Sequence, residues 1–497
     1  MKRQRIPNVA ATHYDLPMSA TQVEPRIARP GQTIPLLVWV AIGAMGAVII
    51  AAAGSVSPTA ALAATVALAV IAAVVARPAI LPLILVASIF IEAARVEGTT
   101  ITRVLAPIAL LVILVQLIRG RASIRSGPIL LWAGAYGLWA LASGLWTTSS
   151  AGTVFQLSSL SIAVVYMLAF ATLIESSRDL ERVVWMVVVA SVVFAALSPQ
   201  HVSEALHLRQ VFDAGRTQGG IGDPNAFAAT QLIAVPLVFA LAGQVKKRSL
   251  QIGLYVTAVV IMGSILHSLS RGGLIGLAVL LVLLAVVPFR VVFRTRRNKT
   301  IALLVVALGV AALSVRYSSE LTRRVETTFN QQADPGASSG SGRTYLWLAA
   351  RTSIEERPWL GLGYGGFRPA SNELLLRTPG VDLNVYRIRA GGQPAHSAYI
   401  GSLAELGFLG LVLYLSLFIA AGHSLRKAAI QARKTRAFFA ASVAGALQLS
   451  LVAWAVSSLF LSAETSRAFW IILGIALALP TVIASEGGSE ASEAVEA

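Results

Sequence analysis

Three residues of this sequence combine the chemistry and the position needed to handle a phosphorylated substrate at a membrane surface. Arg271 lies in a short turn between long apolar runs, and Arg343 opens a predicted helix after a glycine- and serine-rich stretch. An arginine keeps its charge and can bind phosphate through paired hydrogen bonds, and a helix N-terminus attracts anions. His396 stands directly before a further apolar run, where the positive end of a helix favours the neutral, proton-accepting imidazole. Together they predict an anion site with a general base.

Each of these residues also has a purely structural interpretation. Arg271 could be an interfacial arginine that extends its side chain towards water, and Arg343 could be an exposed charge on a surface helix. A single histidine at a membrane boundary is more often structural than catalytic. A charge close to hydrocarbon is nevertheless costly, which favours a function for Arg271.

The composition places the chain among membrane proteins. Of the 497 residues, 56% are hydrophobic and 13% are charged, against roughly 25% charged in soluble domains. The net charge of +17 does not indicate nucleic-acid binding, because the basic residues punctuate apolar segments and form no solvated patch. The sequence contains no cysteine, which excludes a disulfide framework, a thiolate metal site and a cysteine nucleophile.

Apolar runs long enough to cross a bilayer, which takes ~20 residues, predict an all-α polytopic membrane protein with about 12–14 transmembrane helices. The runs are 35–54, 58–76, 78–94, 101–118, 128–147, 155–174, 182–198, 225–243, 249–267, 272–293, 300–316, 397–421, 437–460 and 467–484. They divide the chain into a disordered cytoplasmic N-terminus (1–34), an N-terminal transmembrane bundle (35–198), further transmembrane helices (199–316), a large extracytoplasmic loop with short helices (317–395), C-terminal transmembrane helices (396–484) and an acidic disordered tail (485–497).

The basic residues orient these helices. With the N-terminus in the cytoplasm, every lysine of the chain falls on the cytoplasmic side, as positively charged residues do in membrane proteins. The opposite face receives Arg216, the Arg271 turn and the whole 317–395 loop, which together contain many arginines and no lysine. Water-soluble chemistry is therefore expected on that face.

The 317–395 loop carries the densest set of motifs. A helix predicted from Thr344 to Glu356 ends at Arg357-Pro358, because a residue before proline is turned away from the helical region. The glycines at 361, 363, 365 and 366 indicate a tight turn beside the site, since no strand precedes them to make a nucleotide-binding loop.

Glu405 lies ~13 Å along the next predicted helix from His396, at ~1.5 Å per residue. It is therefore expected to be a buried hydrogen-bonding or charge-pairing group that supports the site from below. The outer loops contain no Asp-x-Asp and no histidine pair at helical spacing. No metal or other cofactor is expected, and arginines would take over at a diphosphate the role that Mg²⁺ often has.

In their order along the chain, these motifs resemble the O-antigen ligase and polymerase superfamily of bacterial envelope glycosyltransferases. The resemblance covers about 216–470 and depends on the order of the motifs and on their common membrane face. The matching elements are Arg216 with Gly219 and Asp223-Pro224-Asn225, Ser270-Arg271-Gly272-Gly273, Gly342-Arg343 with Trp347, Arg357-Pro358-Trp359-Leu360-Gly361-Leu362-Gly363, and His396-Ser397-Ala398-Tyr399 with Glu405-Leu406-Gly407.

The resemblance implies an integral membrane glycosyltransferase of cell-envelope polysaccharide biosynthesis. It would transfer a glycan from an undecaprenyl-diphosphate donor to an acceptor hydroxyl without a metal, on the outer face of the bacterial inner membrane. Arg271 and Arg343 would hold the diphosphate, and His396 would activate the acceptor hydroxyl. Its partners would be the lipid-linked glycan, a glycan, lipid or protein acceptor and the membrane lipids, with no nucleic acid. The further substrate-binding candidates are Arg216, Arg357, Tyr399 and Glu405.

A transporter or flippase of lipid-linked glycans is the alternative from another class. Such proteins place charges in the middle of several spans and break helices at matching places in two halves. Here the charges lie at the outer ends, and the sequence shows no internal repeat. An extracytoplasmic sensor is a third interpretation, which the lack of a cytoplasmic output domain disfavours. Ligase and polymerase stay equally open, because they differ only in the acceptor.

Overall fold

The computed structural model describes residues 76–93, 95–96, 99–196, 218, 220–316, 318–319, 340–381, 388 and 390–496, together with positions 65, 74 and 322. The chain divides into two units, Met1–Val70 and Ile71–Ala497. Only the second contains more than one described residue, and all that follows concerns it. The expected runs 35–54 and most of 58–76, the expected N-terminal segment 1–34 and the site candidate Arg216 lie outside the described residues.

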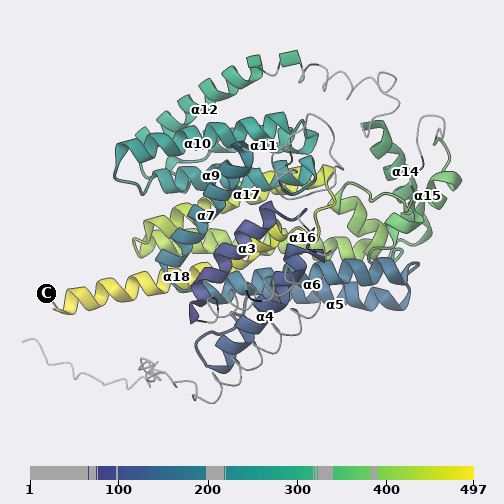
Figure 1. Ribbon diagram of the computed structural model, residues 1–497, viewed down its shortest axis with the longest axis horizontal. Coiled ribbons are helices and arrows are strands. Elements are labelled where there is room, and N and C mark those ends of the chain that lie inside the picture. Colours follow the sequence, from purple (N-terminus) through teal and green to yellow (C-terminus); the bar gives the residue numbers. More distant parts are fainter. Residues whose placement is uncertain are drawn as a thin grey trace, which may run out of the picture. The chain divides into compact units, whose positions relative to one another are not determined.

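The second unit is a bundle of helices with one two-stranded hairpin (Figure 1). Eight of the described helices are long and apolar enough to cross a membrane, and two more are apolar but shorter. The chain is an all-α polytopic membrane protein, as its hydropathy predicts. The helices of the bundle are α3 (Leu81–Phe90), α4 (Ile101–Ile118), α5 (Pro128–Ala142), α6 (Ser150–Leu173), α7 (Ser177–Ala196), α9 (Pro224–Ala242), α10 (Arg248–His267), α11 (Arg271–Val286), α12 (Arg296–Arg316), α16 (Ala398–Lys434), α17 (Phe438–Ser457) and α18 (Arg467–Glu496).

The shorter elements connect these helices. The 317–395 segment contributes α14 (Gly340–Glu356) and α15 (Phe367–Arg377), which pack on each other. The remaining short elements are η1 (Pro78–Ile80), β1 (Arg95–Val96), β2 (Thr99–Thr100), η2 (Ser143–Leu145), η3 (Phe289–Val291) and η4 (Ser458–Phe460).

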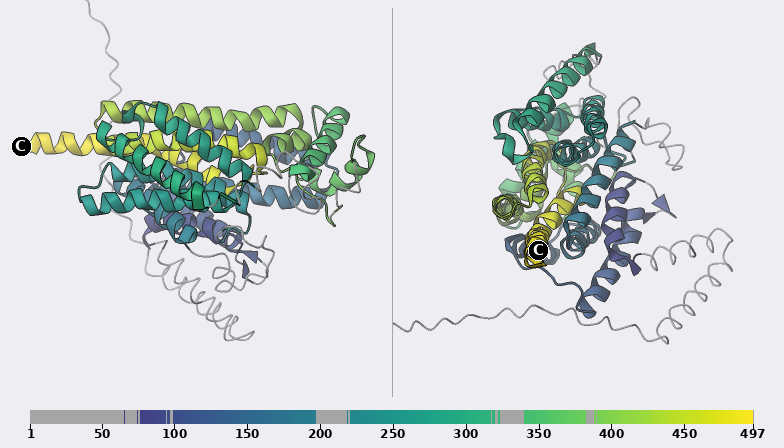
Figure 2. Two further views of the ribbon diagram at one scale, coloured as in Figure 1. Left: turned by 90° about the horizontal axis from the view of Figure 1, so that it is seen from above. Right: turned by 90° about the vertical axis from the view of Figure 1, so that its left-hand side faces the viewer.

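One end of the bundle carries α14 and α15, and we call it the insert end (Figures 1 and 2). Four helices start at this end with a side-chain cap: Ser149 caps α6, Asp223 caps α9, Ser270 caps α11 and Ser397 caps α16. Each cap accepts a hydrogen bond from a backbone N–H that has no partner within its helix, which typically stabilises by ~1 kcal/mol. The helix ends that surround the site are therefore fixed locally by the sequence.

The opposite end is basic. The lysines there lie where α9 meets α10, at the start of α12 and at the end of α16. Arg125 joins neighbouring elements at this end, because its guanidinium donates to the carbonyls of Ile174 and Ala478 at 3.1–3.2 Å. We call it the basic end. The segregation of lysines expected from the sequence is therefore present between the two ends of the described bundle.

Several expected boundaries differ in the structure. The apolar run 272–293 is one helix only to Val286, because Pro288 interrupts it before η3. The helix expected to begin at Thr344 starts at Gly340 and ends at Glu356 as expected. In the tail expected to be disordered from 485, α18 continues to Glu496.

A further difference concerns α16, which is broken at Gly407. This residue has φ 68° and ψ −170°, so that α16 is really a short first helix followed by a long one. A break frees backbone carbonyls, which in a membrane-embedded helix must find other donors. Here two of the donors come from the 317–395 segment, so the break is a docking point for that segment.

Candidate active site

Arg271 is presented at the insert end by a tight turn between α10 and α11. Leu269 in this turn has a φ of 51°, in the left-handed region, which reverses the chain within three residues. The Ser270 hydroxyl accepts a hydrogen bond from the N–H of Gly273 and donates to Asn225 Oδ1 at 2.9 Å. The start of α9 therefore holds the turn in place, and Arg271 is half-buried beside it.

Phe460 joins this turn to the insert. A Cβ on Gly272 would lie 3.0 Å from the carbonyl oxygen of Ser457 and 3.2 Å from the Cβ of Phe460, so α11 begins in close contact with η4. On its other side, the Phe460 ring faces the indole of Trp347 in α14, with ring centroids 6.4 Å apart. Phe460 thus lies between the Arg271 turn and α14.

Trp347 in turn joins α14 to the segment that carries His396. Its indole Nε1 donates a hydrogen bond to the carbonyl of Ala395 at 2.9 Å, immediately before the histidine. Arg343 precedes Trp347 by four residues, and residues at that spacing share a face of a helix. Arg343 is therefore on the face of α14 that is turned towards the His396 segment.

His396 adopts a left-handed backbone conformation, with a φ of 51°. This conformation costs a non-glycine residue about 1–2 kcal/mol and persists only where the surroundings enforce it. Here both neighbours, Ala395 and Ser397, are buried, and Ser397 caps α16. The imidazole is thereby held, half-buried, at the N-terminal end of α16.

The structure thus places the three residues expected to carry the chemistry at the same end of the bundle (Figure 1). Arg271, Arg343 and His396 come from the starts of α11, α14 and α16, and the contacts of Phe460 and Trp347 link these starts. We call this group the Arg–His cluster. Arg357 lies elsewhere, exposed at the C-terminal end of α14, and its expected contact with substrate stays a prediction.

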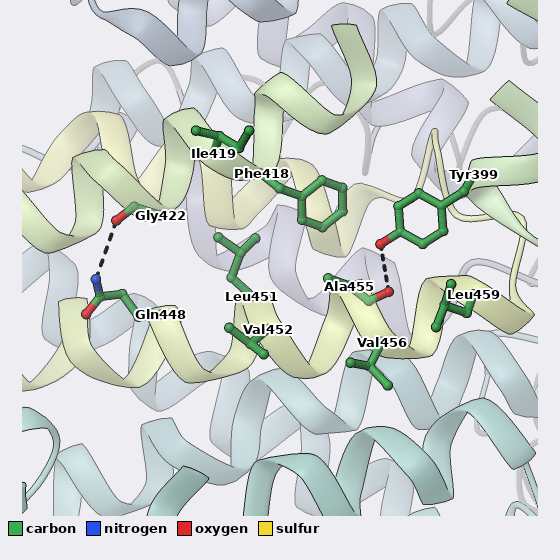
Figure 3. Close-up of a pocket in the computed structure, with 10 residues that line it drawn as sticks. All are labelled: Tyr399, Phe418, Ile419, Gly422, Gln448, Leu451, Val452, Ala455, Val456 and Leu459. Atoms are coloured by element: carbon green, nitrogen blue, oxygen red, sulfur yellow. Dashed lines mark hydrogen bonds between the residues drawn. The ribbon is translucent and has the colours of Figure 1, made fainter. Parts of the chain in front are cut away.

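Tyr399 borders an apolar groove between α16 and α17 (Figure 3). Its hydroxyl donates to the carbonyl of Ala455 at 2.7 Å and so closes the groove at the end nearest His396. The groove has a volume of about 540 Å³ and is lined mainly by aliphatic side chains and Phe418. Ile419 in its wall is 72% exposed, so the groove opens on the outer surface of the bundle, where lipid would lie.

Residues 256–415, from α10 into α16, match the family model described as O-antigen ligase. We call this matched stretch the ligase domain. The match confirms the family expected from the motifs, over a shorter range than 216–470. No curated protein matches the chain. The ligase domain contains all three residues of the Arg–His cluster, whereas Phe460, which links them, follows it in the chain.

Within the ligase domain, the glycine-rich loop after α14 docks on the break in α16. The N–H groups of Leu362 and Gly363 donate to the carbonyls of Ala404 and Glu405 at 3.0 and 2.8 Å. The indole of Trp139 donates to the next free carbonyl, that of Leu406, at 3.0 Å. The carbonyls freed by the break are thereby satisfied, which secures the ligase domain's insert against its membrane helix.

Glu405 completes this docking. Its two carboxylate oxygens accept hydrogen bonds from the N–H groups of Gly365 at 2.8 Å and Phe367 at 3.3 Å. This confirms the expectation of a hydrogen-bonding group, which is half-buried in the structure. Because these bonds go to the backbone of the loop, Glu405 positions the loop; its expected contact with substrate stays a prediction. Gly361 and Gly363, with φ of 66° and 85°, make the tight turn that the sequence indicates.

Glu464 is a buried acidic residue that the motifs do not include. It lies in the connection between η4 and α18, and its Oε1 is 2.7 Å from the point where a Cβ on Gly401 would stand. That point is 4.0 Å from the Cβ of Ala395, so the carboxyl group lies close to the residue that precedes His396. The sequence does distinguish this residue, because Glu464 is the only acidic residue between Glu405 and Glu486 and lies between two apolar runs.

Burial raises the pKa of Glu464 well above its ordinary value. A carboxyl group whose pKa is raised by folding stabilises the folded state while it is protonated, and this contribution is lost as the pH rises through the raised pKa. Replacing Glu464 by glutamine is therefore expected to flatten the decline of stability between about pH 5 and about pH 8. Thermal unfolding of the purified protein at both pH values measures this effect. A change of ~1 kcal/mol in the free energy of unfolding would shift the melting temperature by roughly 2 °C.

The matched control for this prediction is Glu355→Gln. Glu355 is an exposed carboxylate on α14, paired with Arg351 at 2.7 Å. Its replacement should leave the pH dependence of the melting temperature as in the wild type, because an exposed pair contributes little. Equal pH slopes in the wild type and Glu464→Gln would show that the Glu464 carboxyl is not the group whose ionisation costs stability.

Proposed function

We propose that the protein is a membrane glycosyltransferase that moves a glycan from an undecaprenyl-diphosphate donor to an acceptor hydroxyl, in the synthesis of cell-envelope polysaccharide. The observation that carries the proposal is the Arg–His cluster at the insert end of the bundle. Two permanent cations and one base, delivered by three separate elements, match the needs of a transfer that releases a diphosphate. The O-antigen ligase domain that contains them supports the same conclusion.

In the proposed reaction, His396 accepts the proton of the acceptor hydroxyl as its oxygen attacks the anomeric carbon. The bond between that carbon and the phosphate oxygen breaks, and the diphosphate leaves with the bonding electrons on the face opposite the attack, so that the configuration inverts. Arg271 and Arg343 stabilise the charge that develops on the leaving diphosphate. These cations take the place of a metal, so the reaction is proposed to be metal-independent.

The groove beside Tyr399 supports a donor carried on a lipid. It is apolar, it opens sideways from the bundle, and its closed end lies at the third residue after His396 (Figure 3). A polyprenyl chain in this groove would place its diphosphate next to the Arg–His cluster. The apolar contact would anchor the donor without contributing polar groups to the reaction.

The distribution of charge supports an orientation for the reaction. Lysine-rich segments remain in the cytoplasm, so the basic end is proposed to face inwards. The insert end, with the Arg–His cluster, would then face the extracytoplasmic side of the bacterial inner membrane. Whether the acceptor is a lipid, a protein or another lipid-linked glycan distinguishes a ligase from a polymerase, and both agree with the proposal.

The break in α16 is the one feature that favours the transporter alternative. Transporters use the free carbonyls of broken helices to bind ions or substrate. Here the carbonyls of Ala404, Glu405 and Leu406 are bonded to the glycine-rich loop and to Trp139. They are not available to a transported ion, and the transferase is the better supported function.

The proposal is tested by glycan transfer in proteoliposomes, with a synthetic undecaprenyl-diphosphate oligosaccharide and EDTA throughout. The wild type should form product, and the ladder of product sizes separates a polymerase from a ligase. Arg271→Ala and Arg343→Ala should each lower kcat by about 10²–10³-fold, the usual effect of removing a group that stabilises developing charge. Arg377→Ala is the matched control, because Arg377 is half-exposed in the insert and pairs with Glu356 at 3.3 Å.

Two results would contradict the proposed function or the proposed site. If no acceptor yields product while the wild type moves the lipid-linked glycan across the membrane, the protein is a transporter. If product forms but both arginine variants turn over at the wild-type rate, the protein is a transferase with its site elsewhere. Circular dichroism and a thermal melt of each variant confirm that the fold is retained.

A further inference from the structure

A second pocket at the insert end lies outside the Arg–His cluster. Its volume is about 400 Å³, and it is formed where α3 ends and where α4, α6 and α18 begin. This volume falls in the range of small-molecule sites, roughly 300–1,000 Å³. Unlike the groove between α16 and α17, this pocket is lined almost entirely by polar and charged side chains.

The charges of the pocket are only partly compensated. Arg467, the first residue of α18, forms an ion pair with Glu92, and its side chain is 12% exposed. Arg103 of α4 lies over the ring of Phe155, with its Cζ 5.0 Å from the ring centroid. Among the residues that the structure describes, no carboxylate pairs with Arg103. The pocket therefore holds a neutral ion pair and one further cation.

The polar groups of the lining include both donors and acceptors. The two guanidinium groups only donate, the Glu92 carboxylate only accepts, and the Gln156 amide does both. The hydroxyls of Thr100, Ser159 and Thr465 add groups of either kind. A phosphate group offers acceptors almost alone and would be repelled by Glu92. A sugar residue, with several hydroxyls that donate and accept, matches a mixed lining.

Phe155 adds the apolar surface that such a ligand requires. Its side chain is 55% exposed, and the face of an aromatic ring is electron-rich. The C–H face of a pyranose ring, which carries partial positive charge, can pack on it. The combination of ring, amide, carboxylate and guanidinium therefore favours a hydroxyl-rich ring over a simple anion.

The pocket is close to the parts that build the Arg–His cluster. Thr465, which lines the pocket, directly follows Glu464. Both lie in the connection from Phe460, the last residue of η4, to the start of α18. Gln156 touches the glycine-rich loop, because its Cβ is 3.0 Å from the point where a Cβ on Gly365 would stand. A glycan with several sugars could extend from one site to the other along this connection.

We propose that this pocket is a subsite for a sugar residue of the glycan substrate, remote from the bond that reacts. The inference rests on the proposed transferase function. It assigns recognition of the glycan to the residues that line this pocket. Binding at a remote subsite positions a long substrate and contributes binding energy that a single-sugar substrate lacks.

Binding is tested directly by saturation-transfer difference NMR on the purified full-length protein. The probes are the methyl glycosides of a hexose, an N-acetylhexosamine, a 6-deoxyhexose and a hexuronic acid, each with and without inorganic pyrophosphate. We expect saturation transfer to at least one glycoside, retained with pyrophosphate and lost in both Arg103→Ala and Gln156→Ala. Arg121→Ala, an exposed arginine that follows α4 at the basic end, is the matched control and should behave as the wild type.

The transfer assay gives the second readout. With a four-sugar donor, Arg103→Ala and Gln156→Ala should raise KM roughly tenfold, and with a one-sugar donor KM should not change. The subsite is refuted if no glycoside binds, if both variants bind like the wild type, or if pyrophosphate displaces the glycoside, which would indicate a phosphate site. If transfer itself fails, the proposed function falls, and the NMR result still decides whether the pocket binds sugar.

Discussion

Replacing His396 by asparagine is expected to lower the rate of glycan transfer by about 10²–10⁴-fold, the usual contribution of a general base. Asparagine cannot accept the proton of the acceptor hydroxyl. It does tolerate the left-handed backbone that His396 adopts at a φ of 51°, so the start of α16 should be preserved. The effect should fall on kcat, measured in proteoliposomes with the undecaprenyl-diphosphate donor, with KM close to that of the wild type.

The variant His396→Ala separates chemistry from conformation. Alanine removes the base and also strains the backbone, since it disfavours the left-handed region. Both variants should lose activity, and His396→Ala should in addition melt at a lower temperature. His423→Ala is the control, because His423 is exposed on the same helix. An active His396→Asn protein beside an inactive His396→Ala protein would mean that the residue matters for its backbone and not as a base.

Replacing Gly407 by alanine is expected to cause the largest loss of stability among these substitutions. A Cβ at this position would overlap the carbonyl of Trp359, and the φ of 68° disfavours any side chain. The backbone strain alone costs about 1–3 kcal/mol, because φ 68° with ψ −170° is a conformation essentially restricted to glycine. The overlap would also displace the loop, with its hydrogen bonds to Ala404 and Glu405, so a total above ~4 kcal/mol is expected. Thermal unfolding in detergent measures the loss, and limited proteolysis should show earlier cleavage after α14.

Gly134→Ala provides the comparison for Gly407→Ala. Gly134 lies within α5, and a Cβ there would meet nothing within 4 Å. Alanine is the better helix former by about 0.5–1 kcal/mol, so this variant should melt at the wild-type temperature or slightly above it. If Gly407→Ala unfolds at the same temperature as Gly134→Ala, the loop does not depend on the break in α16.

Hydropathy alone predicted most of the helices, because a membrane-spanning segment must satisfy its own backbone and cover itself with apolar side chains. The run 101–118 corresponds residue for residue to α4, and α10 differs from its run only by starting at Arg248. Errors arose where a conformation and not a composition decides the boundary. Gly407 sits in an apolar run like any other glycine, and only the contact with Trp359 shows why the helix breaks there.

For the candidate site, too, the sequence predicted some features and not others. Residue type and position along the chain were enough to single out Arg271, Arg343 and His396, since charged groups beside hydrocarbon are few and costly. The sequence also predicted that Glu405 makes hydrogen bonds, which its bonds to Gly365 and Phe367 confirm, although the residue is half-buried and not fully buried. Their assigned roles in catalysis stay predictions, to be tested by the substitutions above.

What the sequence by itself determined is the class of protein, its family and the residue types at the site, because each depends on local composition or on short motifs. Only the tertiary structure decided how these residues meet. Phe460 and Glu464 come from the connection between α17 and α18, 64 and 68 residues beyond His396 and without a motif. Packing against Gly272, Trp347 and Gly401 gives them their place. Contacts between residues so far apart in the chain follow from the arrangement of the helices, which no local pattern specifies.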